Sequence, residues 1–231
     1  MKRSELNEIL REGKAFLERM NFHLPEWAQW SPEDWQQAGH EYDEIRDNML
    51  GWDITDFGLG DYENVGLLLF TIRNGNPKMD RYVKPYCEKI LICGDEQVTL
   101  THYHWEKMED IICRAGGELW LRLWNGDDDG DKLETPVEVN VDGHEFTIEA
   151  GEEVVLRPGQ SITLTPYLYH EFWGKPAPGE DYVLVGEVSA VNDDEVDNRF
   201  HDERVGRFPA IEEDEPPLHL LCTEYPPAPE D

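Results

Sequence analysis

The stretch that decides the fold is residues 101–110, which read Thr101-His102-Tyr103-His104-Trp105-Glu106-Lys107-Met108-Glu109-Asp110. It lies between two runs that are predicted to be strands, residues 88–100 and 111–124. Because residues i and i+2 of an extended chain point to the same side, His102 and His104 project their imidazoles together. Glu109 follows after four residues, which leaves room for a turn that brings its carboxylate to the same point. Two nitrogens and one oxygen suit Mn, Fe, Co, Ni or Zn, and suit calcium poorly.

A fourth ligand is expected from a distant part of the chain, and His170 in Pro166-Tyr167-Leu168-Tyr169-His170 is the first candidate. A His-x-His alone is often only two surface residues of a strand. Here His-x-His-x4-Glu is followed by Gly116 and, further on, by a Pro-x3-His. This pair of motifs resembles those of the cupin superfamily, in which three His and one Glu bind a metal inside a small β-barrel. The resemblance implies that His102, His104, Glu109 and His170 are metal ligands.

Composition limits the kind of protein. At 231 residues the chain fits one large β domain or two small ones, and its 39% hydrophobic residues are ample for a core. The formal net charge of −31 argues against nucleic-acid binding, which needs a basic face, and against an anionic membrane surface. A small neutral ligand is indifferent to this charge, whereas a strongly anionic one needs a local basic pocket.

The expected location is the cytoplasm. The N-terminus runs Met1-Lys2-Arg3-Ser4-Glu5 into a charged segment without the apolar region of a signal peptide. No apolar run approaches the roughly 20 residues of a membrane span. The four cysteines show no CxxC or zinc-ribbon spacing and are expected to be free thiols.

Helices are predicted before residue 51. Residues 4–21 carry apolar side chains near helical spacing, which predicts an amphipathic helix. Ser31-Pro32-Glu33-Asp34 combines an N-cap, a first-turn proline and acidic residues, so a second helix is expected to reach about Gln37. A third is expected from about Glu41 to Met49. All are expected to pack outside a barrel, as structural elements or as part of a dimer contact.

From Gly51 onward the pattern is typical of β-structure, with short strands separated by Gly, Pro and Asp turns. The predicted fold is mainly β, a cupin jelly-roll β-barrel with N-terminal α-helices packed outside. The whole chain, 1–231, is read as a single domain: a helical extension (1–50), a barrel core (51–210), and a C-terminal strand and tail (211–231). Within that last part, residues 218–222 are expected to add an edge strand.

An acidic loop imitates a calcium site. Asp127, Asp129 and Asp131, with Glu138 at the twelfth position, match calcium-loop ligands. Lys132 stands where such a loop needs glycine, and the flanks are predicted to be strands. A solvated turn is the better interpretation.

Nearly the whole chain resembles the cupin-type D-lyxose isomerases, a family of bacterial sugar ketol-isomerases. The resemblance rests on the 102–112 motif and on further segments: residues 23–25, 50–53, 69–75, 88–90, 168–170, 172–173, 185–189, 191–194, 197–198 and 214–216. The resemblance implies a homodimeric cytoplasmic enzyme that uses Mn²⁺ to interconvert D-lyxose with D-xylulose and D-mannose with D-fructose. Other divalent metals such as Co²⁺, Fe²⁺ or Zn²⁺ remain open. Departures lie mainly in residues 127–135 and 201–209, which leaves substrate preference open.

Isomerisation moves a proton between C1 and C2 and develops negative charge on an oxygen. A divalent metal can stabilise the resulting enediolate, and the carbon acid needs a base. The catalytic candidates are Lys89, Glu109 and Glu187. Glu187 lies between apolar residues and would be costly to bury without a partner, which makes it the leading base. Lys89 could exchange a proton with the sugar oxygens, or could be an ordinary solvent-facing strand lysine.

Further residues are candidates for binding the sugar. Trp105 and Phe172 could stack on the apolar face of a pyranose, although aromatics beside a metal motif are as often core. Asp194 and Arg207 could bond hydroxyls, and Arg207 has an alternative role as a salt-bridge partner. Lys89 and Glu213 complete the set, with Glu213 in an acidic run that is usually a solvated face.

Three rival functions share parts of this pattern. A cupin dioxygenase uses the same ligands with Fe(II), and ligand spacing does not separate the two. A non-catalytic sugar-binding cupin commonly lacks some ligands, whereas all four candidates are present here. A phosphosugar isomerase needs a basic phosphate pocket. The residues that could form one are Arg73, Lys78, Arg81 and Lys84.

Overall fold

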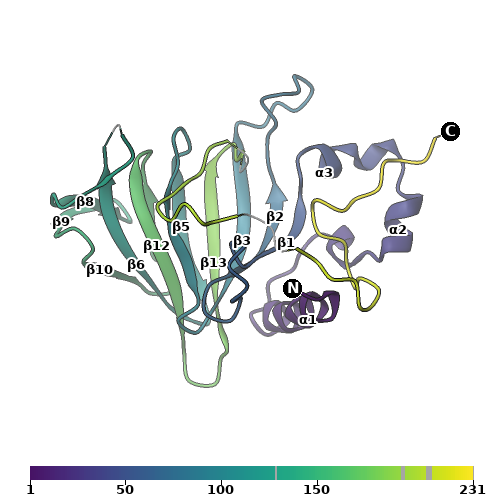
Figure 1. Cartoon of the computed structure of the whole chain (residues 1–231), viewed down its shortest axis with the longest axis horizontal. Coiled ribbons are helices and arrows are strands. Elements are labelled where there is room, and N and C mark those ends of the chain that lie inside the picture. Colours follow the sequence, from purple (N-terminus) through teal and green to yellow (C-terminus); the bar gives the residue numbers. More distant parts are fainter. Residues whose placement is uncertain (128, 194–195, 207–209, 231) are drawn as a thin grey trace.

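The computed structural model describes residues 1–127, 129–193, 196–206 and 210–230. The protein is mainly β, which confirms the predicted fold class: two antiparallel sheets face each other and curl into a barrel (Figure 1). The larger sheet runs in the order β1 (Gly51–Thr55), β2 (Leu67–Arg73), β3 (Tyr86–Gly94), β13 (Tyr182–Ala190), β5 (Glu109–Ala115), β11 (Ser161–Leu164), β8 (Val137–Val141) and β9 (His144–Ile148). The smaller sheet runs β10 (Glu153–Leu156), β6 (Gly117–Gly126), β12 (Leu168–Pro176), β4 (Val98–Tyr103) and β14 (Arg199–Phe200), and β7 (Lys132–Leu133) pairs with β6.

The main core fills the space between the two sheets. Along β6, the buried residues Leu119, Leu121 and Leu123 alternate with partly exposed ones, as in a strand with one face inward. They meet inward residues of the larger sheet such as Leu91 and Cys113. All four cysteines are buried and free, as expected.

A second core lies outside the barrel. Helix α1 (Arg3–Arg19) lays its apolar face, including Leu10 and Phe16, on the outer face of β2 and β3, where Phe70 and Ile90 are buried. Strand β3 is therefore buried on both faces along most of its length. The helices lie outside the barrel, as predicted, at the β1 side of the larger sheet (Figure 1).

The other N-terminal helices are short. Helix α2 (Pro32–Gln37) begins at Ser31, whose hydroxyl accepts a hydrogen bond from the Asp34 amide, as the N-cap prediction requires. Helix α3 covers only Asp43–Asp47 and follows a 3₁₀ turn at His40–Tyr42, so the predicted helix over 41–49 is broken. A further 3₁₀ turn covers Glu26–Gln29.

The predicted edge strand is wrong. Residues 218–222, which the structure describes in full, form no strand. Side chains and an isolated backbone contact hold this segment: the Leu218 amide donates to Asn7 Oδ1, and the Cys222 amide donates to the Trp52 carbonyl. The segment thus packs against α1 and β1 without joining a ladder.

In the acidic loop, the Asp127 carboxylate accepts hydrogen bonds from the amides of Asp129 and Asp131. The carboxylate thus stabilises the turn to which Asp127 belongs, which agrees with the interpretation of this loop as a turn. None of the helices in the described part of the chain is long and apolar enough to cross a membrane.

Candidate active site

Three imidazoles converge at one end of the barrel interior. His102 lies on β4 and His170 on β12, directly opposite each other in the ladder, and His104 follows β4. All three side chains are buried, and their ligand nitrogens lie within 4.8 Å of one another. The Nε2 atoms of His102 and His170 are 3.1 Å apart. The spacing of His102 and His104 and the motif that singled out His170 predicted this meeting, and the pairing of β12 with β4 produces it.

The other ring nitrogen of each histidine is fixed by the backbone. Each Nδ1 lies 2.7–2.9 Å from a carbonyl oxygen: His102 with Leu100, His104 with Asp197, and His170 with Leu168. A carbonyl only accepts, so each Nδ1 carries the proton and donates it. Each Nε2 lone pair is then directed into the cluster, which is the arrangement typical of metal-binding histidines.

Glu109, the fourth expected ligand, lies at the start of β5 beside two of these imidazoles. Its Oε1 lies 3.2 Å from His170 Nε2 and 3.4 Å from His104 Nε2. His104 Nε2 is buried and has no hydrogen-bond partner among the described residues. A buried acceptor without a donor is costly, and a cation would satisfy it. The four side chains therefore fit a divalent first-row metal.

Electrostatics favours the protonation states that bind a metal. Burial, with the neighbouring His170 and His104, holds the pKa of His102 well below its usual value. Burial alone would raise the pKa of Glu109, but the nearby Lys107 and His104 outweigh it and hold that pKa well below its usual range. Neutral imidazole and ionised carboxylate are the forms that coordinate metals.

Lys107 was missed by the sequence reasoning. Its side chain is 3% exposed, and Nζ lies 2.6 Å from Glu109 Oε2 and 2.9 Å from Glu187 Oε1. It also donates to Asn192 Oδ1 over 3.2 Å. The lysine thus joins a candidate metal ligand to the candidate base. The available signal was its position two residues before Glu109 in the sequence.

Glu187 and Lys89 face each other on paired strands. They are directly opposite in the β13–β3 register, both are buried, and Lys89 Nζ lies 3.5 Å from Glu187 Oε1. The same oxygen accepts a hydrogen bond from Ser189 Oγ over 3.2 Å. The expected cost of burying this carboxylate is offset by partners on several sides.

These groups surround a cavity of about 110 Å³. Its polar side holds the histidines His102 and His104 with Lys89, Lys107, Glu109 and Glu187. Its other walls include Phe57, Phe172 and Phe200. The cavity combines metal-ligand geometry, buried acid–base groups and apolar walls, which suits proton transfer to and from carbon.

Of the residues expected to bind the sugar, some line the cavity and others lie away from it. Phe172 lines the cavity. Trp105 lies outside its lining and packs edge-on against Tyr103 and Tyr167. Glu213 is also outside the lining; its carboxylate pairs with Arg3 on α1 over 2.7 Å and is 58% exposed. Its role in the structure is a salt bridge. Asp194 and Arg207 lie outside the described residues.

The chain matches one protein family along nearly its whole length. The sequence profile of the D-lyxose isomerase family matches residues 1–225. A D-lyxose/D-mannose isomerase of Serratia proteamaculans is 50% identical over 97% of this chain and 98% of its own length. A D-lyxose/D-mannose isomerase of Escherichia coli O157:H7 is 46% identical over the same shares.

Solved structures of lower identity share the fold. An L-ribose isomerase of Acinetobacter sp. DL28, solved with L-ribose, superposes with a TM-score of 0.58 at 16% identity, covering 91% of this chain and 98% of that one. The L-ribose isomerase of Cellulomonas parahominis with L-ribose gives 0.58 at 17% identity over the same shares.

Proposed function

The chain belongs to the D-lyxose isomerase family, and from that premise we propose that it interconverts D-lyxose with D-xylulose and D-mannose with D-fructose. It is an isomerase that exchanges aldose and ketose forms of a sugar. The observation that carries the proposal is the convergence of three histidine Nε2 atoms and Glu109 beside the buried pair of Lys107 and Glu187.

His102, His104, Glu109 and His170 would hold a divalent metal, and Mn²⁺ is our proposal for it. Such an ion supplies positive charge next to the sugar oxygens, where negative charge develops during isomerisation. The Nδ1–carbonyl hydrogen bonds keep the three imidazoles turned toward it. Lys107 keeps the second oxygen of Glu109 occupied, which fixes the orientation of the carboxylate.

Glu187 is the proposed base. Its carboxylate takes the proton from C2 of the aldose and returns it to C1, while the hydroxyl proton of O2 passes to O1, which yields the ketose. Lys107 and Lys89 both contact Oε1 of this carboxylate and can donate hydrogen bonds to the sugar oxygen that gains negative charge. The apolar wall with Phe172 limits the access of water to the proton in transit.

A neutral sugar suits this chain better than a sugar phosphate. The basic residues that could have formed a phosphate pocket are each paired with a carboxylate: Arg73 with Glu88, Lys78 with Asp193, Arg81 with Asp47, and Lys84 with Glu44. Pairing removes the excess positive charge that a phosphate requires.

The location and the assembly are further proposals. We propose a homodimer that works in the cytoplasm, as the family resemblance implies. Sedimentation equilibrium checks the first part: a mass of about twice the 26.9 kDa chain is expected, and a purely monomeric protein would contradict it.

A sugar panel tests the function. Metal-stripped protein is reconstituted with Mn²⁺ and supplied with D-lyxose, D-mannose and one phosphosugar, while oxygen uptake is recorded. We expect lyxose to give xylulose and mannose to give fructose without oxygen uptake. Turnover of the phosphosugar alone, or oxygen consumption, would replace the proposal by one of its rivals.

A matched pair of variants tests the base. Glu187→Gln keeps the shape of the side chain and is expected to lower kcat by about 10²–10⁴-fold. Glu171→Gln is the control, because that carboxylate bonds Thr101 and Arg122 and does not line the cavity. Equal kcat values for the two variants would exclude Glu187 as the base.

A further inference from the structure

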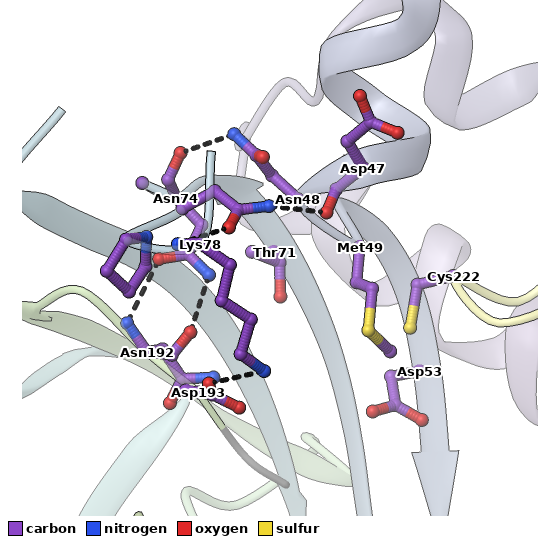
Figure 2. A pocket seen from close by; sticks show the side chains of 13 residues that line it. Asp47, Asn48, Met49, Asp53, Thr71, Asn74, Lys78, Asn192, Asp193 and Cys222 are labelled. Carbon is purple, nitrogen blue, oxygen red and sulfur yellow. Dashed lines mark hydrogen bonds and ion pairs between the residues drawn. The ribbon is translucent and has the colours of Figure 1, made fainter. Parts of the chain in front are cut away.

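A second cavity adjoins the one that holds the histidines. It has a volume of about 170 Å³ and is shown in Figure 2. Asp53, which is 4% exposed, belongs to the lining of both cavities. Asn192 lines the second cavity, and its Oδ1 accepts the hydrogen bond from Lys107 of the first. The two spaces therefore share the Asp53 side chain, and the Lys107–Asn192 hydrogen bond links their linings.

Hydrogen bonds between asparagines hold the wall beside Asn192. Asn74 Nδ2 donates to the Asn192 carbonyl over 2.8 Å, and the Asn192 amide donates back to Asn74 Oδ1 over 3.0 Å. Asn48 Nδ2 donates to the Asn74 carbonyl over 3.1 Å. These bonds hold amide groups at the cavity before any ligand arrives, which lowers the ordering cost of binding.

The lining suits hydroxyl groups and disfavours phosphate. Lys78 is the only cation among the described residues of the lining, and its ammonium lies 2.8 Å from Asp193 Oδ2. Two further carboxylates, Asp47 and Asp53, also line the space. Carboxylates accept hydrogen bonds from hydroxyls, whereas they repel a phosphate dianion.

We propose that this second cavity receives the far end of a hexose, the C6 hydroxymethyl group that D-mannose has and D-lyxose lacks. The inference rests on the proposed function. C1 and C2 must lie near Glu187 and the histidine cluster, so the opposite end of the sugar chain points away from them. The space beyond Asp53 is the adjoining polar volume, and it sets whether a six-carbon sugar is accepted as well as a five-carbon one.

Filling this space tests the inference. Cys222 lines the second cavity but not the first, and its side chain lies near that of Met49 in Figure 2. In Cys222→Leu, we expect the ratio of kcat/KM for D-mannose to kcat/KM for D-lyxose to fall about ten- to hundredfold, in line with the effect of one misfitting carbon group. Met49→Phe fills the same space from another segment and is expected to lower the same ratio.

Met79→Phe is the matched control. Met79 belongs to the same loop as Lys78, is 40% exposed and does not line the cavity, so the ratio should stay at the wild-type value. A ratio that is unchanged in both filling variants, or a loss of the two activities in equal proportion in both, would overturn the inference and leave the isomerase function standing. No turnover of either sugar by metal-loaded wild-type protein would overturn the proposed function itself.

A phosphorylated hexose supplies a second readout. Wild-type protein is expected to convert D-mannose 6-phosphate at least about 100-fold less efficiently than D-mannose, because the phosphate would enter a lining rich in carboxylates. More efficient conversion of the phosphate ester would contradict the assignment of this cavity to a neutral hydroxymethyl end.

Discussion

Replacing Lys107 with methionine removes the buried ammonium that lies within hydrogen-bond distance of both Glu109 and Glu187. Methionine is close to lysine in length, so the change removes charge and hydrogen bonds with little loss of packing. Two buried carboxylates then lose their shared cation. Breaking a buried ion pair by removal of one partner costs about 3–5 kcal/mol.

This cost translates into measurable quantities. For a chain of this size, about 1 kcal/mol corresponds to roughly 2–4 °C in Tm, so metal-free Lys107→Met should unfold roughly 6–20 °C below wild type. The variant should also lose activity by about 10²–10⁴-fold, because Lys107 positions the proposed base. Calorimetry of the metal-free protein and kcat with D-lyxose at saturating Mn²⁺ measure the two effects separately.

Lys84→Met is the control for a simple loss of charge. Lys84 pairs with Glu44, and both side chains are more than a third exposed. Such surface pairs contribute about 0–1 kcal/mol, so this variant should keep both its Tm and its activity. A Lys107→Met protein that behaves like Lys84→Met would refute the central role of the buried network.

Three further outcomes are expected. His104→Ala should bind less metal and lose most activity, and a variant with full metal content and full turnover would exclude His104 as a ligand. Burial lowers the pKa of His219 below its unfolded value of about 6.5, so below that pH the unfolded chain binds more protons than the folded one. The free energy of unfolding, measured in urea from pH 7.5 to 5, should therefore fall for the wild type. It should fall less for His219→Gln, which has no imidazole to protonate. Gly116→Ala should lower the free energy of unfolding by about 2 kcal/mol or more, because φ is +85° and the new Cβ would lie 2.5 Å from the Tyr182 carbonyl oxygen. Gly143→Ala, where φ is +80° but the space is open, should lower it by only about 1 kcal/mol in the same urea assay. Equal costs at the two glycines would contradict this steric account.

The metal-ligand geometry was accessible to sequence reasoning because it depends on local rules. His102 and His104 share a side through the two-residue period of extended chain. His170 was reached by a motif, and the structure places it opposite His102 in the neighbouring strand. The amphipathic N-terminal helix was equally local, since its apolar spacing is visible within one segment.

The acid–base network was less accessible because it depends on which strands are neighbours. Glu187 was singled out for its apolar surroundings, but its partner Lys107 is 80 residues away in sequence. Only the pairing of β13 with both β3 and β5 brings Lys89, Lys107 and Glu109 around Glu187. From the sequence alone, Lys107 is expected only to lie in the turn before Glu109.

In the C-terminal segment, the sequence predicted a strand that the structure does not form. Leu218-His219-Leu220-Leu221-Cys222 has the composition of a strand, yet it is held by contacts with Asn7, Trp30 and Trp52. These partners come from the helical extension and β1. A short apolar run does not distinguish such packing from a strand.

The most direct test of the central claim is a titration of metal-stripped protein with Mn²⁺, in which bound metal and D-lyxose isomerisation are followed together. We predict that turnover rises from near zero and saturates at one ion per chain, and that it is absent in His104→Ala. Full turnover by the stripped protein, or saturation of activity without stoichiometric binding, would contradict an isomerase built on His102, His104, Glu109 and His170.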